Sequence, residues 1–142
     1  MSQALLARAS ITIGADASKV WDALTNPALI KKWLFGTEAV SDWKVGSPIV
    51  FTGEWEGKRY EDKGRILEMA PGRLLRYTFW SSFSGLEDKP ENYAKVSFEL
   101  SKAPGGTRLD ITQDGSADEK ARDHSQANWN TVLAAMKNLL EG

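Results

Sequence analysis

Residues 116–141 carry one apolar stripe with the spacing of an α-helix, and this stripe restricts the fold more than any other feature. Large apolar side chains recur along it at helical spacing: Trp129, Val132, Met136, Leu139 and Leu140. A helix with a single apolar face is stable when that face lies against another apolar surface. The rest of the chain must therefore supply such a surface.

The two halves of this predicted helix differ in the size of their side chains. Ser116 followed by Glu119 forms a capping box, which predicts that the helix begins there. Continued toward the N-terminus, the stripe consists of Asn128, Ser125 and Ala121, which are small or polar. We expect the first half of the helix to leave a gap against its surface, and such a gap indicates a pocket.

The first quarter of the chain predicts one strand and two short helices. Residues 5–13 alternate between apolar and polar side chains, as a half-buried strand does. Asp16 is a suitable N-cap for a helix that ends at Thr25. A second helix is expected over residues 27–34, because proline fits the first helical position and the residue before it avoids helical angles. The residues expected to be buried on the first helix are Val20, Trp21 and Leu24.

The middle of the chain contains only strand patterns, separated by turns rich in glycine and proline. The predicted strands are residues 37–41, 48–55, 58–68, 74–81, 93–102 and 107–113. We therefore expect an α+β fold with the order β-α-α-β-β-β-β-β-β-α, in which a curved antiparallel sheet encloses the last helix. A sheet curved around one helix leaves a cavity unless large side chains fill it.

Several short segments, taken in order, resemble the helix-grip superfamily of START proteins and birch-pollen allergens (SRPBCC). Within it they resemble the branch named after the activator of Hsp90 ATPase. The resemblance covers residues 9–140 and rests on Val20-Trp21-Asp22-Ala23-Leu24-Thr25-Asn26-Pro27 with Trp33, Val45-Gly46, Gly64-Arg65-Ile66-Leu67-Glu68, Gly106-Thr107, and Trp129 with Leu133. It implies a helix-grip fold, and the superfamily includes lipid and hormone carriers, polyketide cyclases and proteins without an assigned activity.

The same resemblance implies less about partners, because one fold can support many functions. The Hsp90 activator itself has an additional chaperone-binding domain at its N-terminus. We expect residues 1–142 to form a single domain with no room for that additional domain, which counts against chaperone activation. The sequence leaves a homodimer open.

Composition excludes several other classes of protein. The net charge of -1 gives no basic surface for nucleic acid, and no apolar run approaches the length of a membrane span. With no cysteine there is no disulfide or thiolate chemistry, which suits the cytoplasm. The chain has a single histidine, His124, and no phosphate-loop, dinucleotide or nucleophile-elbow motif. We therefore expect no metal, no cofactor and no catalytic residue.

Aromatic side chains on the second helix and the middle strands supply the candidate ligand site. Superfamily members line their cavity with these segments, and strand alternation places Phe51 with Trp55, and Tyr77 with Phe79, on common faces. The predicted ligand-binding residues are Trp33, Phe51, Trp55, Tyr77 and Phe79, together with His124, Ser125 and Asn128 on the last helix.

We expect this site to bind a small hydrophobic or aromatic molecule, because rings offer a large contact area to a flat ligand. Two alternatives remain open. One is an enzyme of the polyketide-cyclase or hydratase type that uses polar groups such as His124, Asn128 or Tyr60. The other is an interaction module, chaperone-linked or dimeric, with no small ligand.

Overall fold

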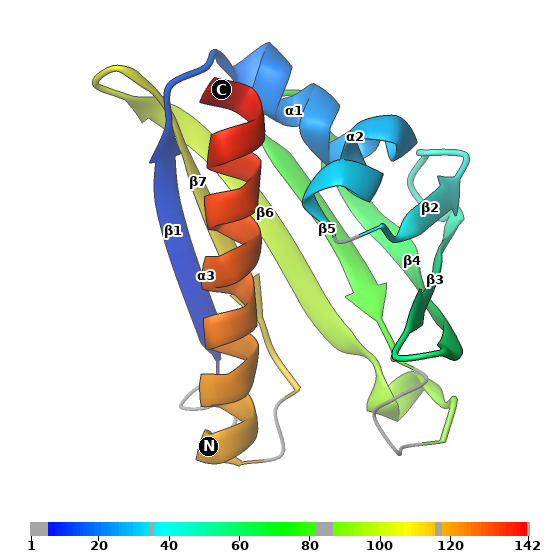
Figure 1. Cartoon of the computed structure of the whole chain (residues 1–142). Coiled ribbons are helices and arrows are strands. Elements are labelled where there is room, and N and C mark those ends of the chain that lie inside the picture. Colours follow the sequence, from blue (N-terminus) through cyan, green and yellow to red (C-terminus); the bar gives the residue numbers. More distant parts are fainter. Residues whose placement is uncertain (1–5, 35, 82–86, 116–117, 142) are drawn as a thin grey trace.

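The computed structural model describes residues 6–34, 36–81, 87–115 and 118–141, which fold as a curved sheet with helices on one face (Figure 1). In chain order the elements are β1 (Ala7–Ile13), α1 (Ala17–Thr25), α2 (Pro27–Trp33), β2 (Glu38–Ser41), β3 (Pro48–Trp55), β4 (Lys58–Ala70), β5 (Leu74–Phe79), the 3-10 turn η2 (Pro90–Asn92), β6 (Ala94–Ala103), β7 (Gly106–Gln113) and α3 (Glu119–Glu141). The predicted α+β class and helix-grip arrangement are confirmed.

The described strands form one antiparallel sheet in the order β1-β7-β6-β5-β4-β3-β2. Consecutive strands from β2 to β7 make a meander, and β1 pairs with β7 so that Ala7 lies opposite Gln113 and Ile13 opposite Thr107. Helices α1 and α2 carry the chain from β1 at one edge to β2 at the other (Figure 1). The two short helices therefore form a layer that crosses the sheet.

Helix α3 lies along β1, with its C-terminal end beside α1 (Figure 1), and Trp129 contacts Gln113 of β7 and Phe98 of β6. Its buried residues are Val132, Leu133 and Met136. Trp129, Leu139 and Leu140 pack against the core but are only partly buried. All five residues of the predicted stripe therefore belong to the core or pack against it, and the Glu141 carboxylate at the last turn accepts a hydrogen bond from the Gly14 N–H.

The start of α3 corrects the sequence prediction. The helix begins at Glu119, and the Asp118 carboxylate accepts a hydrogen bond from the Ala121 N–H at 2.8 Å. Asp118 is thus the N-cap, since a cap side chain bonds the amide three residues ahead. The predicted cap, Ser116, lies outside the described residues. Aspartate and serine are about equally good N-caps, so sequence alone did not decide between them.

The hydrophobic core lies between the sheet, α1, α2 and the second half of α3. On α1 its members are Val20, Ala23 and Leu24. Trp21, which we expected to be buried, is half-exposed. Positions 20, 23 and 24 share one face of a 3.6-residue helix, and position 21 is turned about 100° away from position 20.

Candidate functional site

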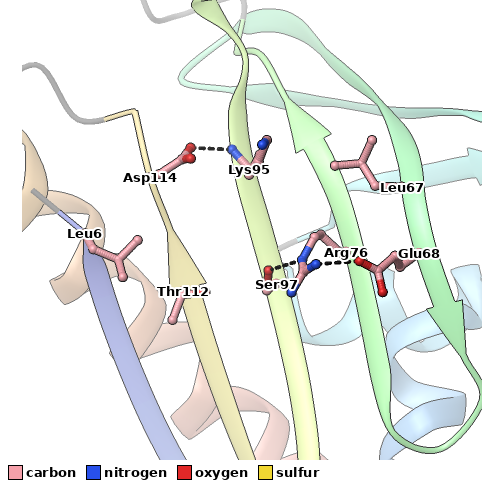
Figure 2. A pocket seen from close by; sticks show the side chains of 8 residues that line it. All are labelled: Leu6, Leu67, Glu68, Arg76, Lys95, Ser97, Thr112 and Asp114. Carbon is pink, nitrogen blue, oxygen red and sulfur yellow. Dashed lines mark hydrogen bonds and ion pairs between the residues drawn. The ribbon is translucent and has the colours of Figure 1, made fainter. Parts of the chain in front are cut away.

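A hollow of about 450 Å³ lies on the sheet face opposite the helices (Figure 2). Its lining is mostly charged or hydroxyl-bearing: Leu6, Leu67, Glu68, Arg76, Lys95, Ser97, Thr112 and Asp114. The Arg76 guanidinium donates to Ser97 Oγ at 2.9 Å and to Glu68 Oε1 at 2.5 Å. An apolar ligand does not suit this surface, because hydrophobic pockets have mainly apolar walls.

The helix-covered face is different, since aromatic rings from three strands and α3 form a continuous row on it. The Phe51 ring lies 5.9 Å from that of Tyr77 and 6.0 Å from that of Phe79, between centroids. Tyr77 lies 5.8 Å from Phe98, which meets Trp129 edge-on at 5.6 Å. Tilted and edge-to-face pairs at these distances are favourable. This row, from Phe79 to Trp129, is called the aromatic row below.

The aromatic row reaches solvent at both ends. Phe51, Tyr77 and Phe98 in its middle are buried, whereas Phe79 and Trp129 are partly exposed. The Trp129 indole is held in place because its Nε1 donates to Gln113 Oε1 on β7 at 2.8 Å. A small molecule could therefore contact the row without crossing the centre of the core.

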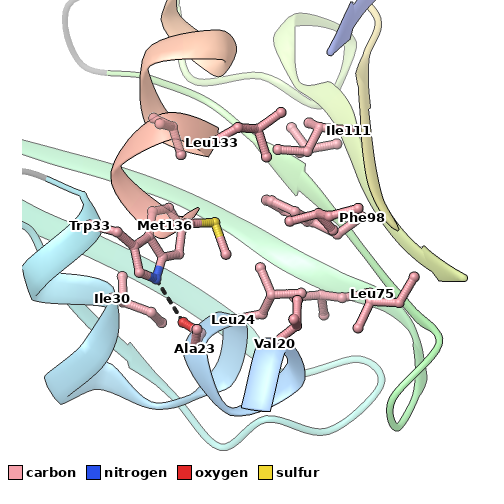
Figure 3. Packing of buried hydrophobic residues seen from close by; sticks show 14 of the residues in the cluster. Val20, Ala23, Leu24, Ile30, Trp33, Leu75, Phe98, Ile111, Leu133 and Met136 are labelled. Atoms are coloured by element: carbon pink, nitrogen blue, oxygen red, sulfur yellow. Dashed lines mark hydrogen bonds between the residues drawn. The ribbon is translucent and has the colours of Figure 1, made fainter. Parts of the chain in front are cut away.

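A cavity of about 10 Å³ lies beside the row, between the sheet and helices α1 and α2. Its lining consists of Leu24, Ile30, Trp33, Trp43, Ile49, Phe51, Leu75, Tyr77 and Phe98. This volume holds at most about one water molecule, whereas small-molecule pockets measure roughly 300–1,000 Å³. Figure 3 shows buried side chains of α1, α2, α3 and the strands meeting in the space beneath the helices.

Two tryptophans form part of the cavity wall in different ways. Trp33 is buried, and its Nε1 donates to the Ala23 carbonyl oxygen of α1 at 2.7 Å (Figure 3). Trp43 belongs to the loop between β2 and β3, and it is the one partly exposed member of the described lining. Its φ of 56° lies in the left-handed region, which is unusual for a residue with a side chain.

The structure separates the residues predicted to bind a ligand. Trp33, Phe51 and Tyr77 meet at the cavity, and Phe79 belongs to the aromatic row. The three predicted residues of α3 do not line the cavity: His124 and Asn128 are exposed, and Ser125 is half-buried. The Trp55 side chain lies outside the described part of the structure. The cavity is at the end of α3 where α1 and α2 pack, and these three residues are in its first half.

Sequence reasoning did not include Phe98 and Trp43 in the site. The strand pattern indicated that Phe98 faces inward, because it alternates in phase with Val96 and Leu100. Trp43 belongs to no periodic segment, so no local signal could place it.

A second aromatic and polar cluster lies near η2. The Lys63 ammonium pairs with Asp88 at 2.5 Å and lies 5.7 Å from the centre of the Trp80 ring, which stacks on Tyr93. The hydrogen bonds from Lys63 and Tyr93 lower the pKa of Asp88, and the bond to Asp88 raises the pKa of Lys63. Lys63 and Asp88 are solvated, so we interpret the cluster as a tie between β4 and the segment before β6.

The described residues give no indication of a metal or membrane site. No three His, Cys, Asp or Glu side chains gather as metal ligands would, within that part of the chain. No described helix combines the length and apolar character needed to span a bilayer.

The curved sheet, the crossing helices and α3 define a helix-grip protein with an aromatic core. The model of the family described as activator of Hsp90 ATPase homolog 1-like protein matches residues 14–141, and the chain belongs to this family. The family predicted from the sequence is therefore confirmed.

Solved structures agree with this assignment. Protein ChR145 from Cytophaga hutchinsonii is 46% identical, with a TM-score of 0.83 over 96% of this chain and 93% of that chain. The Aha1 dimer from Colwellia psychrerythraea is 20% identical, with a TM-score of 0.75 over 96% of each chain. CalU16 from Micromonospora echinospora is 24% identical, with a TM-score of 0.66 over 92% of this chain and 71% of that chain. The last two show the fold alone. No curated protein sequence matches the chain significantly.

Proposed function

We propose that this protein binds a small hydrophobic or aromatic molecule in the core between the curved sheet and its helices. The observation that supports this function is the aromatic row, which is continuous from Phe79 to Trp129 and reaches solvent at both ends. Apolar walls with aromatic faces suit flat, lipophilic molecules. Membership of a helix-grip family is consistent with this role.

A ligand needs more space than the cavity of about 10 Å³ provides, so part of the wall must move. Trp43 is the lining residue best placed to do so, because it is partly exposed and belongs to a loop rather than to a helix or strand. Its left-handed backbone also costs about 1–2 kcal/mol, which lowers the cost of leaving this conformation. In the bound state the ligand occupies the space of the Trp43 indole, against Trp33 and Phe51.

The experiment is a calorimetric titration of fluorene, a planar apolar probe, into the wild type and the Trp43→Ala variant. We expect saturable binding to the wild type and about tenfold tighter binding to Trp43→Ala, because no ring then has to be displaced. The matched control is Trp21→Ala, which removes a half-exposed indole that packs on the core but does not line the cavity. Its affinity should equal that of the wild type. Absence of saturable binding to both the wild type and Trp43→Ala would overturn the proposal.

An interaction module without a small ligand is the second candidate, and the nearly filled core favours it. The Aha1 relative from Colwellia psychrerythraea is a dimer, so a second copy of the chain is the partner to test first. Native mass spectrometry of gently purified protein separates the two candidates. A monomer with a co-purified small molecule supports the binding protein, and a ligand-free dimer supports the interaction module.

A further inference from the structure

The hydroxyl of Tyr77 differs from the indole N–H groups of Trp33 and Trp129, which both have hydrogen-bond partners. Tyr77 is only 6% exposed, and its hydroxyl has no hydrogen-bond partner among the residues that the structure describes. Burial is the cause that raises the pKa of this phenol above its ordinary value. In contrast, Trp33 Nε1 donates to Ala23 O and Trp129 Nε1 donates to Gln113 Oε1.

A phenylalanine at position 77 would pack the same space without this cost. The Tyr77 ring lies between Phe51 and Phe98, with centroid distances of 5.9 and 5.8 Å, and neither contact needs the hydroxyl. A buried hydroxyl without a partner costs about 1–3 kcal/mol, so such a group in a native core calls for an explanation.

A trapped water does not explain the hydroxyl. The cavity that Tyr77 lines has a volume of about 10 Å³, which is the lower limit for one water molecule. A buried water also needs about two to four polar partners. The other described side chains of the lining carry two polar groups: the Trp33 N–H, which is already bonded to Ala23, and the N–H of Trp43, whose side chain is partly exposed.

We infer that the Tyr77 hydroxyl donates a hydrogen bond to an oxygen of the bound molecule and thereby selects its chemical class. This inference rests on the proposed function. The ligand class is planar, apolar molecules that are neutral and have a carbonyl oxygen. No described lining residue is cationic, and burying an unpaired carboxylate costs far more than one hydrogen bond returns. The site therefore prefers an aromatic ketone to the matching hydrocarbon or carboxylic acid.

Three probes with one ring system test this preference: fluorene, 9-fluorenone and 9-fluorenecarboxylate. Each is titrated by calorimetry into the wild type, Tyr77→Phe and Tyr93→Phe. The control variant Tyr93→Phe also removes one tyrosine hydroxyl, but from a side chain that bonds Asp88 and does not line the cavity. In the wild type we expect 9-fluorenone to bind about tenfold more tightly than fluorene, and the carboxylate to bind most weakly.

Tyr77→Phe should abolish the preference for 9-fluorenone and keep the affinity for fluorene, whereas Tyr93→Phe should keep both. Equal affinity of the wild type for the ketone and the hydrocarbon, or a preference that survives in Tyr77→Phe, would overturn this inference and leave the proposed function intact. Failure of all three probes to bind the wild type and Trp43→Ala would overturn the proposed function itself.

The urea midpoint of ligand-free Tyr77→Phe gives an independent check. We expect it to equal or exceed that of the wild type, because the variant removes an unsatisfied polar group. A lower midpoint would show that the hydroxyl already has a partner in the free protein, and would overturn the inference without any ligand.

Discussion

Trp33 on α2 and Ala23 on α1 are joined by a hydrogen bond of 2.7 Å from the indole Nε1 to the main-chain carbonyl oxygen. Both residues are buried, and Trp33 also lines the cavity. This carbonyl lies in α1, three residues before Asn26, which is both the C-cap of α1 and the N-cap of α2. The bond therefore holds the second helix over the sheet at the point where the chain changes direction.

Trp33→Phe should destabilise the protein by about 2–4 kcal/mol, because it leaves a carbonyl oxygen buried with one partner fewer and leaves unfilled volume beside the cavity. Urea unfolding followed by circular dichroism measures this change. The matched variant is Trp21→Phe, which makes the same substitution at a half-exposed site and should cost less than about 1 kcal/mol. Equal losses in the two variants would show that the bond to Ala23 contributes nothing.

Gly64→Ala should prevent stable folding or cost more than about 3 kcal/mol. A Cβ atom at Gly64 would lie 1.6 Å from the Thr78 carbonyl oxygen, so β4 and β5 could not keep their present separation. Gly14→Ala is the control: there the Cβ would meet the flexible Glu141 carboxylate at 3.2 Å, and the side chain can move away. We expect that variant to fold and to lose at most the contribution of the bond between the Gly14 N–H and Glu141, about 1 kcal/mol. If the Gly64→Ala variant were as stable as the Gly14→Ala variant, β4 and β5 would not approach each other as closely at Gly64 as the structure shows.

Asp118→Ala should cost about 1 kcal/mol, because the Ala121 N–H loses its acceptor at the start of α3. Asp118→Asn keeps a side-chain oxygen and should recover most of the loss. The loss of stability in Ser116→Ala is compared with that in Asp118→Ala, because the sequence predicts Ser116 as the cap and the structure has Asp118. Thermal unfolding of the three variants gives the result, and a larger loss in Ser116→Ala than in Asp118→Ala would favour Ser116 as the cap.

Glu141 should make part of the stability depend on pH. The Lys137 ammonium at 2.5 Å and the Gly14 N–H at 2.7 Å lower the pKa of the Glu141 carboxyl in the folded protein. A carboxyl whose pKa is lowered by folding stabilises the protein above its unfolded pKa, and this contribution is lost as the pH falls through the folded value. The wild type should therefore be more stable than Glu141→Gln near neutral pH, and the difference should decrease as the pH falls below the ordinary range of a glutamate carboxyl.

Melting temperatures of the wild type and Glu141→Gln, measured from about pH 7 to about pH 3, test this expectation. The other carboxyl groups titrate in both proteins, so their effect cancels in the difference. A difference that stays constant over the whole range would mean that the charge of Glu141 plays no part.

Much of the fold could be predicted because its signals are local. Asn26-Pro27 ends α1 and begins α2 through the backbone preferences of two adjacent residues. Alternation along each strand was enough to expect Phe51 and Tyr77 to be oriented toward the helices, where the structure buries both. The family followed from the order of such segments along the chain.

The candidate site was less predictable, since it depends on residues distant in the sequence. Helical spacing correctly gave α3 an apolar face, but it did not reveal that α1 and α2 pack near the second half of α3 and leave His124 and Asn128 exposed. Trp43 had no pattern at all, yet its ring forms part of the cavity wall.

The sequence by itself determined the order of the elements, their inward faces and the family, because caps, turns and alternation act over a few neighbouring residues. Only the tertiary structure decided that the cavity measures about 10 Å³. It also decided that the hydroxyl of Tyr77, a lining residue, has no hydrogen-bond partner among the described residues. Protein interiors are close-packed, so the space left in a core depends on how side chains from distant segments interlock. The pattern of one strand does not predict how much of the core is filled by side chains of the helices that cover it.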